Sequence, residues 1–256
     1  MFQGLYLNMD RATERRARVE AVLNDAGLAA NYRRVAAVDG RSIDPTWAST
    51  KAGAVGCFMS HLAALAAAAE FDGITPRHRG RHNRQLPPPL LSRVRYGETR
   101  AGEVRHRLSS LWIDYPTLPS FIEKCRETRG EVRLFDAREA RISSTDSYVV
   151  SRKSAAKLHK LLSSTGPTKP VDNMMQYMTR LGELKAAFTL PFLTCIDPLT
   201  GVSSSIVEIA SDEYRLLALS RRLVYADSGT VELPSATEVA PALRPTLEYI
   251  RTCAGL

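Results

Sequence analysis

The feature that most constrains the fold is a basic segment, residues 76–108, that interrupts an otherwise ordinary globular sequence. It holds nine arginines, no lysine, three of the five histidines and four of the fourteen prolines. Glu98 and Glu103 are its only acids, so it carries +7 of the chain's net charge of +8. It shows no helical or strand period, and the run Pro87-Pro88-Pro89 breaks any regular element. We therefore expect an exposed, irregular excursion.

Outside this segment, short apolar runs alternate with amphipathic runs, which is typical of an α/β protein. The expected strands cover residues 2–8, 32–38, 147–150 and 186–190. The expected helices cover residues 55–70, 118–128, 153–163, 171–184 and 214–223, and an earlier helix ending near Gly27 carries an apolar row at Val19, Val22, Leu23 and Ala26. The helix over residues 55–70 is apolar around most of its circumference, so we expect it to be largely buried.

Length and composition agree with a globular protein. A chain of 256 residues, 44% hydrophobic and 24% charged, can form one large domain or two small ones, and it is neither disordered nor fibrous. No run approaches the roughly 20 apolar residues of a membrane span, and the first residues show no signal-peptide pattern. The four cysteines lie far apart, which indicates neither a zinc site nor a disulfide framework and fits a reducing cytoplasm.

The first expected strand ends in polar residues, Asn8, Asp10 and Arg11, directly before a helix. The end of a strand followed by the start of a helix suits a nucleotide phosphate or sugar. The same pattern also occurs in an ordinary strand–turn–helix with Asp10 near the helix cap. Taken alone, the motif leaves both interpretations open.

Two later motifs carry candidate site residues. Ser60 and His61 lie in the alanine-rich helix, where they could contact a ligand or serve as ordinary satisfied polar residues. Asp172 follows Pro170 at a helix start, a position where an acid complements the helix dipole. The functional alternative makes Asp172 a general base at the mouth of an α/β cleft.

Taken in order, five segments resemble glycosyltransferase family 25, the lipooligosaccharide and lipopolysaccharide sugar transferases that also include collagen galactosyltransferases. The segments are LNMDR (7–11), VAAVDG (35–40), GAVGCFMSH (53–61), SYVVSRKSAAKL (147–158) and PVD (170–172). Their order and spacing both match the family pattern. The resemblance covers residues 2–70 and 111–206.

The resemblance implies a GT-A-like, Rossmann-like nucleotide-sugar-binding fold as a single domain over residues 1–206, with residues 207–256 as an extension of uncertain structure. It implies a nucleotide-sugar donor, often UDP-galactose, a divalent metal (Mn or Mg), and a lipooligosaccharide, lipopolysaccharide or other oligosaccharide acceptor. For this chain the resemblance implies a bacterial, cytoplasmic enzyme with peripheral contact to the inner membrane. Carried onto this chain, the donor-binding residues are Asn8, Asp10, Arg11, Asp39, Gly40, Ser60 and His61, and the base that deprotonates the acceptor hydroxyl is Asp172.

One part of the family pattern is missing. Family members hold the metal with carboxylates at a strand end, because a leaving nucleoside diphosphate carries negative charge that a hard cation neutralises. Here no acid occurs between Asp72 and Glu98. We therefore expect the sheet to lack that strand, and the missing acids argue against catalytic competence of the chain as written.

The genetic code offers an explanation for the missing motif. Reading the codons of residues 76–82 one base forward permits Leu-Val-Ile-Glu-Asp-Asp-Ile, and reading those of residues 103–108 the same way permits Lys-Tyr-Asp-Ile-Val-Phe. Both strings match family strands, although the free wobble positions make each match permitted rather than forced. We interpret the segment as the product of two compensating frameshifts, near Thr75 and just after Leu108, which the gene's nucleotide sequence can decide.

Two other functions stay open at this point. The basic segment could bind nucleic acid or an acidic surface, although it offers no aromatic residue besides Tyr96, so nucleic acid is not the expected partner. A catalytically dead homologue could also keep the fold and bind a nucleotide weakly. Salt-dependent DNA binding would favour the binder, whereas donor-dependent sugar transfer or saturable UDP binding would favour the transferase.

Overall fold

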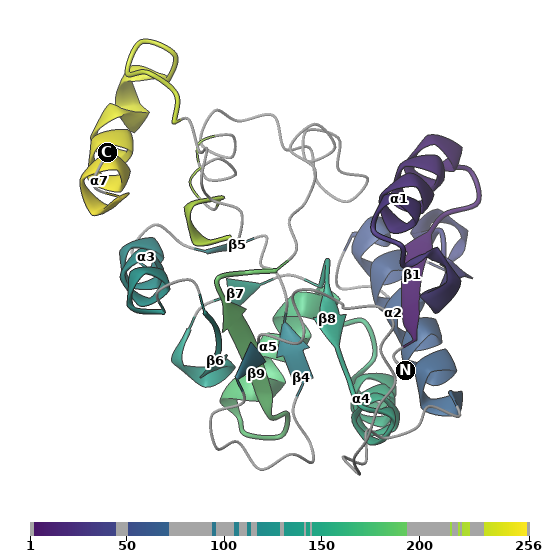
Figure 1. The fold of residues 1–256 in the computed structure, drawn as a ribbon. Helices are drawn as coiled ribbons and strands as arrows, with labels where there is room; N and C mark the ends of the chain where they lie inside the picture. Colours follow the sequence, from purple (N-terminus) through teal and green to yellow (C-terminus); the bar gives the residue numbers. More distant parts are fainter. Residues whose placement is uncertain are drawn as a thin grey trace. The chain divides into compact units, whose positions relative to one another are not determined.

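The computed structural model describes residues 3–44, 51–71, 94–95, 105–107, 112–113, 117–128, 131–140, 142–143, 145–193, 216, 220, 222–225 and 233–254. The chain folds into two compact units, each described here by itself. Unit 1 takes residues 1–83 and 150–175, and unit 2 takes residues 84–149 and 176–256. The expected boundary at residue 206 lies outside the described residues. Both units mix helices with small sheets, which confirms the α/β class (Figure 1).

Unit 1 begins with a strand–helix–strand unit. Strand β1 (Gly4–Asn8) runs parallel to β2 (Tyr32–Ala36), and the register places Gly4 opposite Tyr32 and Asn8 opposite Ala36. Helix α1 (Thr13–Asp25) and the 3-10 turn η1 (Ala29–Asn31) connect them. Gly27 ends α1 with a φ of +66°, a conformation that suits glycine, so the expected helix end is confirmed.

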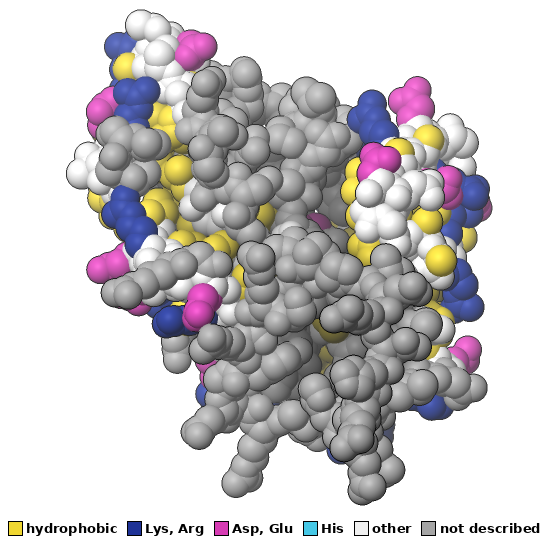
Figure 2. Space-filling model, viewed as in Figure 1, with side chains coloured by type: hydrophobic (Ala, Val, Ile, Leu, Met, Phe, Trp, Pro, Cys, Tyr) yellow, Lys and Arg dark blue, Asp and Glu magenta, His cyan; other side chains and the backbone are white. Residues whose placement is uncertain are grey.

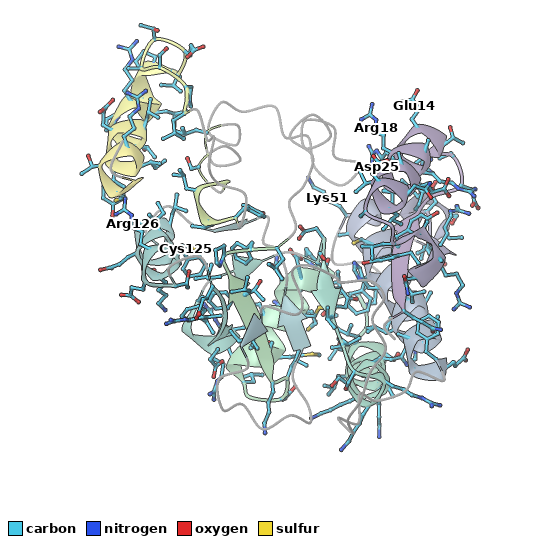
Figure 3. All side chains as sticks on the ribbon, in the orientation of Figure 1. Glu14, Arg18, Asp25, Lys51, Cys125 and Arg126 are labelled. Carbon is cyan, nitrogen blue, oxygen red and sulfur yellow. The ribbon has the colours of Figure 1, made fainter. Side chains whose placement is uncertain are left out.

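The apolar row of α1 is not buried. No residue of α1 is buried, and Val22 is 66% exposed. A polar contact holds the helix to β1 instead, because the Tyr6 hydroxyl donates to Glu20 Oε1 at 2.7 Å. Within α1 itself, Arg16 Nε donates to the same oxygen at 2.8 Å. Apolar side chains stand among charged ones on this outer surface (Figure 2), and the labelled Glu14 and Arg18 project from it (Figure 3).

Helix α2 (Ala52–Glu70) confirms the expected alanine-rich helix and packs against α4 (Arg152–Thr165). Its buried residues include Phe58 and Leu65, but one face remains partly open. Among the described residues, α2 is the one helix long and apolar enough to cross a membrane, which the expectation based on apolar runs missed. The same properties are those of a core helix, so this is weak evidence for a span. The 3-10 turn η2 (Gly40–Ser42) lies against α2.

The helices after residue 150 also follow the sequence pattern. The N-cap of α4 is Ser151, whose hydroxyl accepts from the Ser154 N–H at 3.1 Å, and Gly166 ends the helix with a φ of +65°. Helix α5 (Val171–Arg180) begins where expected but ends four residues early, because Gly182 turns the chain with a φ of +79°.

Unit 2 contains a five-stranded sheet in the order β3-β6-β9-β4-β8. Its strands are β3 (Val94–Arg95), β6 (Val132–Asp136), β9 (Ala186–Leu190), β4 (Arg105–Arg107) and β8 (Tyr148–Val149). Strands β5 (Trp112–Ile113) and β7 (Ile142–Ser143) form a separate antiparallel pair. The expected strands at 147–150 and 186–190 are thus confirmed.

The core of unit 2 is aromatic, and it includes the chain's end. Phe188 of β9 stacks on Phe121 of α3 (Leu118–Glu127), with ring centroids 5.2 Å apart. The 3-10 turns η5 (Ala137–Glu139), η6 (Arg222–Val224) and η8 (Pro241–Leu243) contribute to this unit. Helix α7 (Arg244–Ala254), which no clear sequence pattern predicted, packs Leu247 and Ile250 into the same core. Of the helix expected over residues 214–223, most lies outside the described residues.

The expectation that residues 76–108 form no regular element is wrong at two places. β3 pairs with β6, and β4 lies between β9 and β8. Neighbouring strands supply hydrogen-bond partners that a local sequence pattern does not reveal, so strands form here although the sequence lacks the alternation typical of a strand. The rest of this segment, including the position of the expected metal strand, lies outside the described residues.

Candidate functional site

The two parallel strands of unit 1 end at the same edge, which brings the polar residues that follow them together. Asn8 ends β1, and its carbonyl accepts from the Ala37 N–H at 3.0 Å, so the strands stay paired to the edge. Asp10 and Arg11 follow β1, and Asp39 follows β2. Asn8, Asp10, Arg11 and Asp39, which were expected to bind the nucleotide-sugar donor, therefore lie at one edge of the sheet.

Ion pairs connect these residues into one group. Arg34 binds Asp10 and also donates to the Asn8 carbonyl at 3.0 Å. Asp39 is bound by Arg11 and by Arg41, whose Nη2 lies 2.8 Å from the carboxylate. We call these six residues the strand-end cluster: Asn8, Asp10, Arg11, Arg34, Asp39 and Arg41.

The electrostatics of the cluster favour anions. Hydrogen bonds from Arg41, followed by those from Arg11, hold the pKa of Asp39 well below its usual range, so its carboxylate stays charged. Three guanidinium groups face two carboxylates, which gives a formal net charge of +1. Guanidinium groups bind phosphate oxygens in a directional, bidentate way.

Two buried atoms of the cluster have no hydrogen-bond partner within the described part of the chain. They are Asn8 Oδ1 and Arg34 Nε. Asn8 is only 7% exposed, and its Nδ2 is already used in donating to the Ala12 carbonyl at 3.1 Å. A buried polar group without a partner costs about 1–3 kcal/mol. The cluster therefore presents one acceptor and one donor that a ligand could satisfy.

Gly40 and Ser60 act as scaffold. A Cβ on Gly40 would overlap the carbonyl of Ala52, so the turn after β2 approaches α2 backbone to backbone. Ser60 Oγ accepts from the Val38 N–H at 2.8 Å and donates to the Gly56 carbonyl at 2.6 Å. These contacts fix the loop that carries Asp39, so the two residues position the cluster through the backbone.

His61 and Asp172 lie along α2 and at the start of α5. His61 is 6% exposed. The Asp172 carboxylate accepts from the Asn173 N–H at 2.9 Å, and its charge reaches Cys57, one helical turn before His61. Burial, and then this charge, raise the pKa of the Cys57 thiol to about 11. The structure thus brings Asp172 close to α2 within unit 1.

The described residues do not fit the divalent metal that the family resemblance implies. Among them no group of three or more His, Cys, Asp or Glu side chains could hold a metal ion. Asp10 and Asp39 are both engaged by arginines. Two ion-paired carboxylates fall short of such a ligand group, and we derive no step through a metal.

Sequence reasoning missed three residues of this region: Arg34, Arg41 and Gly56. Arg34 lies inside a strand, and Arg41 follows a turn, where a charged side chain is ordinarily solvated. Arg34 contacts Asp10 and Arg41 contacts Asp39, and only the three-dimensional proximity of the two strand ends reveals these contacts. Gly56 belongs to the recognised GAVGCFMSH segment, and its position one turn before Ser60 was the available signal.

Comparison of the chain with protein-family models, curated proteins and solved structures finds no match in any of the three. The resemblance to glycosyltransferase family 25 therefore stays a prediction. Any function assigned to the chain rests on its residues and on the geometry of the strand-end cluster.

Proposed function

We propose that this chain is a GT-A-like glycosyltransferase of the family 25 type, whose strand-end cluster binds the nucleotide part of a nucleotide-sugar donor such as UDP-galactose. The observation that carries the proposal is the pair of buried atoms without partners, Asn8 Oδ1 and Arg34 Nε. A ribose hydroxyl can donate to the first, and a phosphate oxygen can accept from the second.

The rest of the cluster supports the same ligand class. Its formal charge of +1 suits a diphosphate, and Arg11 and Arg41 can reorient toward phosphate because both are exposed at their ion pairs with Asp39. The family activity would transfer the sugar, galactose by resemblance, to a lipooligosaccharide-type acceptor. In that reaction Asp172 would take the proton from the attacking acceptor hydroxyl.

Transfer itself is expected to be absent or very slow in the chain as written, because the acids that would hold the metal are missing from the sequence. We therefore propose nucleotide binding as the function that this polypeptide retains. Restoring the shifted reading frame over residues 76–108 is expected to return metal-dependent transfer.

Isothermal titration calorimetry with UDP and UDP-galactose tests the proposal. The test variant is Arg34→Lys, which keeps the positive charge but loses the Nε donor. The matched control is Arg33→Lys, because the wild-type Arg33 guanidinium lies 5.1 Å from the Phe71 ring centre and is not part of the cluster. We expect saturable binding, weakened roughly tenfold by Arg34→Lys and unchanged by Arg33→Lys. Absence of saturable binding, together with salt-dependent binding of DNA, would favour the nucleic-acid alternative instead.

A further inference from the structure

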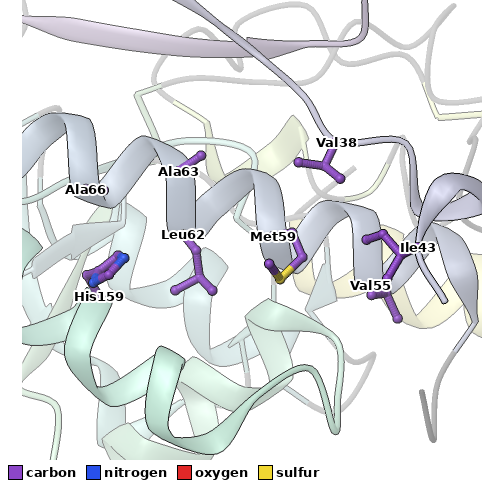
Figure 4. A pocket seen from close by; sticks show the side chains of 8 residues that line it. All are labelled: Val38, Ile43, Val55, Met59, Leu62, Ala63, Ala66 and His159. Carbon is purple, nitrogen blue, oxygen red and sulfur yellow. The ribbon is translucent and has the colours of Figure 1, made fainter. Parts of the chain in front are cut away.

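A second feature of unit 1 shares no residue with the strand-end cluster: an apolar cavity of about 480 Å³ along the open face of α2 (Figure 4). Helix α2 contributes Val55, Met59, Leu62, Ala63 and Ala66. The loop after β2 contributes Val38 and Ile43, and α4 contributes His159. Cavities of this size with apolar walls and few polar groups are typical of small-molecule sites.

The wall from α2 is a straight row. Val55, Met59, Leu62 and Ala66 follow one another at helical spacing, so their side chains share one face. Ala66 lies eleven positions after Val55, which makes the row roughly 16 Å long at ~1.5 Å per residue. An extended hydrocarbon chain gains roughly 1.3 Å per carbon, so the row matches a chain of about 12 carbons.

The cavity has one polar end. His159 lies beside Leu62 and Ala66, at the opposite end of the row from Ile43 and Val55 (Figure 4). Its helix, α4, carries four cationic residues and no acid: Arg152, Lys153, Lys157 and Lys160. A ligand with an apolar tail and an anionic head would therefore meet complementary chemistry at both ends.

We propose that this cavity binds a single-chain anionic amphiphile of the fatty-acid class, with the tail along α2 and the carboxylate at His159. An imidazole N–H can donate to the carboxylate, and the charge of α4 attracts it. The side chains along the row are all apolar, so the hydrocarbon tail displaces no polar group there. The proposal uses no residue of the strand-end cluster and holds whether or not the chain binds a nucleotide.

Titration calorimetry of the full chain with fatty acids of eight to fourteen carbons, below their micelle-forming concentrations, tests the proposal. We expect affinity to rise roughly fourfold per added methylene, up to about 12 carbons, and then to level off. Dodecyltrimethylammonium, with the same tail and a cationic head, should bind at least tenfold more weakly than dodecanoate. Equal affinity for the two head groups would overturn the assignment of the polar end.

Two variants test the position of the tail and the head. Ala66→Phe fills the row, and Ala21→Phe makes the same change on the exposed surface of α1. Dodecanoate affinity should fall at least tenfold for Ala66→Phe and stay unchanged for Ala21→Phe. His159→Glu should weaken dodecanoate tenfold or more but leave dodecanol binding within twofold. Circular dichroism confirms folding, and unchanged dodecanoate affinity in both folded cavity variants would overturn the proposal.

Discussion

Gly40 and Gly56 lie backbone to backbone, and a Cβ built on Gly56 would come within 2.5 Å of the Gly40 nitrogen. One glycine starts η2 and the other lies in the second turn of α2. Their contact, together with the Ser60 hydroxyl bound to the Val38 N–H, sets the position of Asp39. The strand-end cluster therefore depends on a packing contact that admits no side chain.

Gly56→Ala is expected to lower the free energy of unfolding by about 2–3 kcal/mol, because backbone atoms on both sides cannot move aside as a side chain could. Urea denaturation followed by circular dichroism measures the change. Gly27→Ala serves as the comparison, since Gly27 has open space around its Cβ position and only a positive φ. That variant should lose about 1 kcal/mol, and an equal or smaller loss for Gly56→Ala would contradict the close contact.

Asp39 should make the protein sensitive to acid. Its folded-state pKa lies below the unfolded value of about 4, because Arg41 and Arg11 stabilise the carboxylate. This contribution to stability is fully present above about pH 5 and is lost as the pH falls through and below 4. Denaturation of the wild type and Asp39→Asn between pH 2 and 7 should show a smaller acid-induced loss for the variant. Parallel profiles for the two proteins would rule out the ion pairs.

The charge of Asp172 should be detectable at Cys57. Burial is the larger cause of the raised thiol pKa, about 11, and Asp172 is the second. Asp172→Asn is therefore expected to lower the pKa of Cys57 modestly and to speed its alkylation by iodoacetamide at pH 8–9. Mass spectrometry of each cysteine gives the rates, with Cys125 as the internal reference because burial alone raises its pKa. An unchanged Cys57 rate relative to Cys125 would place Asp172 away from α2.

Strand β4 offers a test of the frameshift interpretation. It pairs in parallel with β9, all five residues of which are buried, and strands in that setting are ordinarily apolar. The shifted frame permits Ile and Val in place of His106 and Arg107. The double change His106→Ile with Arg107→Val is thus expected to raise the free energy of unfolding by about 1–2 kcal/mol. Arg133→Val, at an exposed position of β6, is the control, and a destabilised double variant would contradict the interpretation.

Sequence periodicity predicted α2, α4, β1, β2 and β9, because each carries a local pattern of apolar residues or a capping glycine or serine. It did not predict β3 and β4, whose hydrogen-bond partners lie far away in the sequence. The apolar row of α1 predicted a buried face, yet Val22 is exposed, since amphipathic spacing does not guarantee a partner surface.

The candidate site divides in the same way. The motifs named Asn8, Asp10, Arg11 and Asp39, which share one sheet edge because parallel strands end together. The sequence did not predict Arg34 and Arg41 as site residues, because their ion pairs with Asp10 and Asp39 depend on how the strand ends lie in space, which no motif encodes. The resemblance named Gly40 as a donor-binding residue, whereas in the structure its missing side chain allows α2 to approach.

A bound nucleotide is expected to supply the missing partner of Arg34 Nε, and nuclear magnetic resonance can observe that atom directly. Titration of the 15N-labelled protein with UDP should shift the Arg34 Nε–H resonance saturably, along with the Asn8 side-chain amide. The Arg33 Nε–H resonance should stay in place, because that guanidinium lies over Phe71. An Arg34 Nε–H resonance that does not move while UDP reaches millimolar concentration would contradict nucleotide binding at the strand-end cluster.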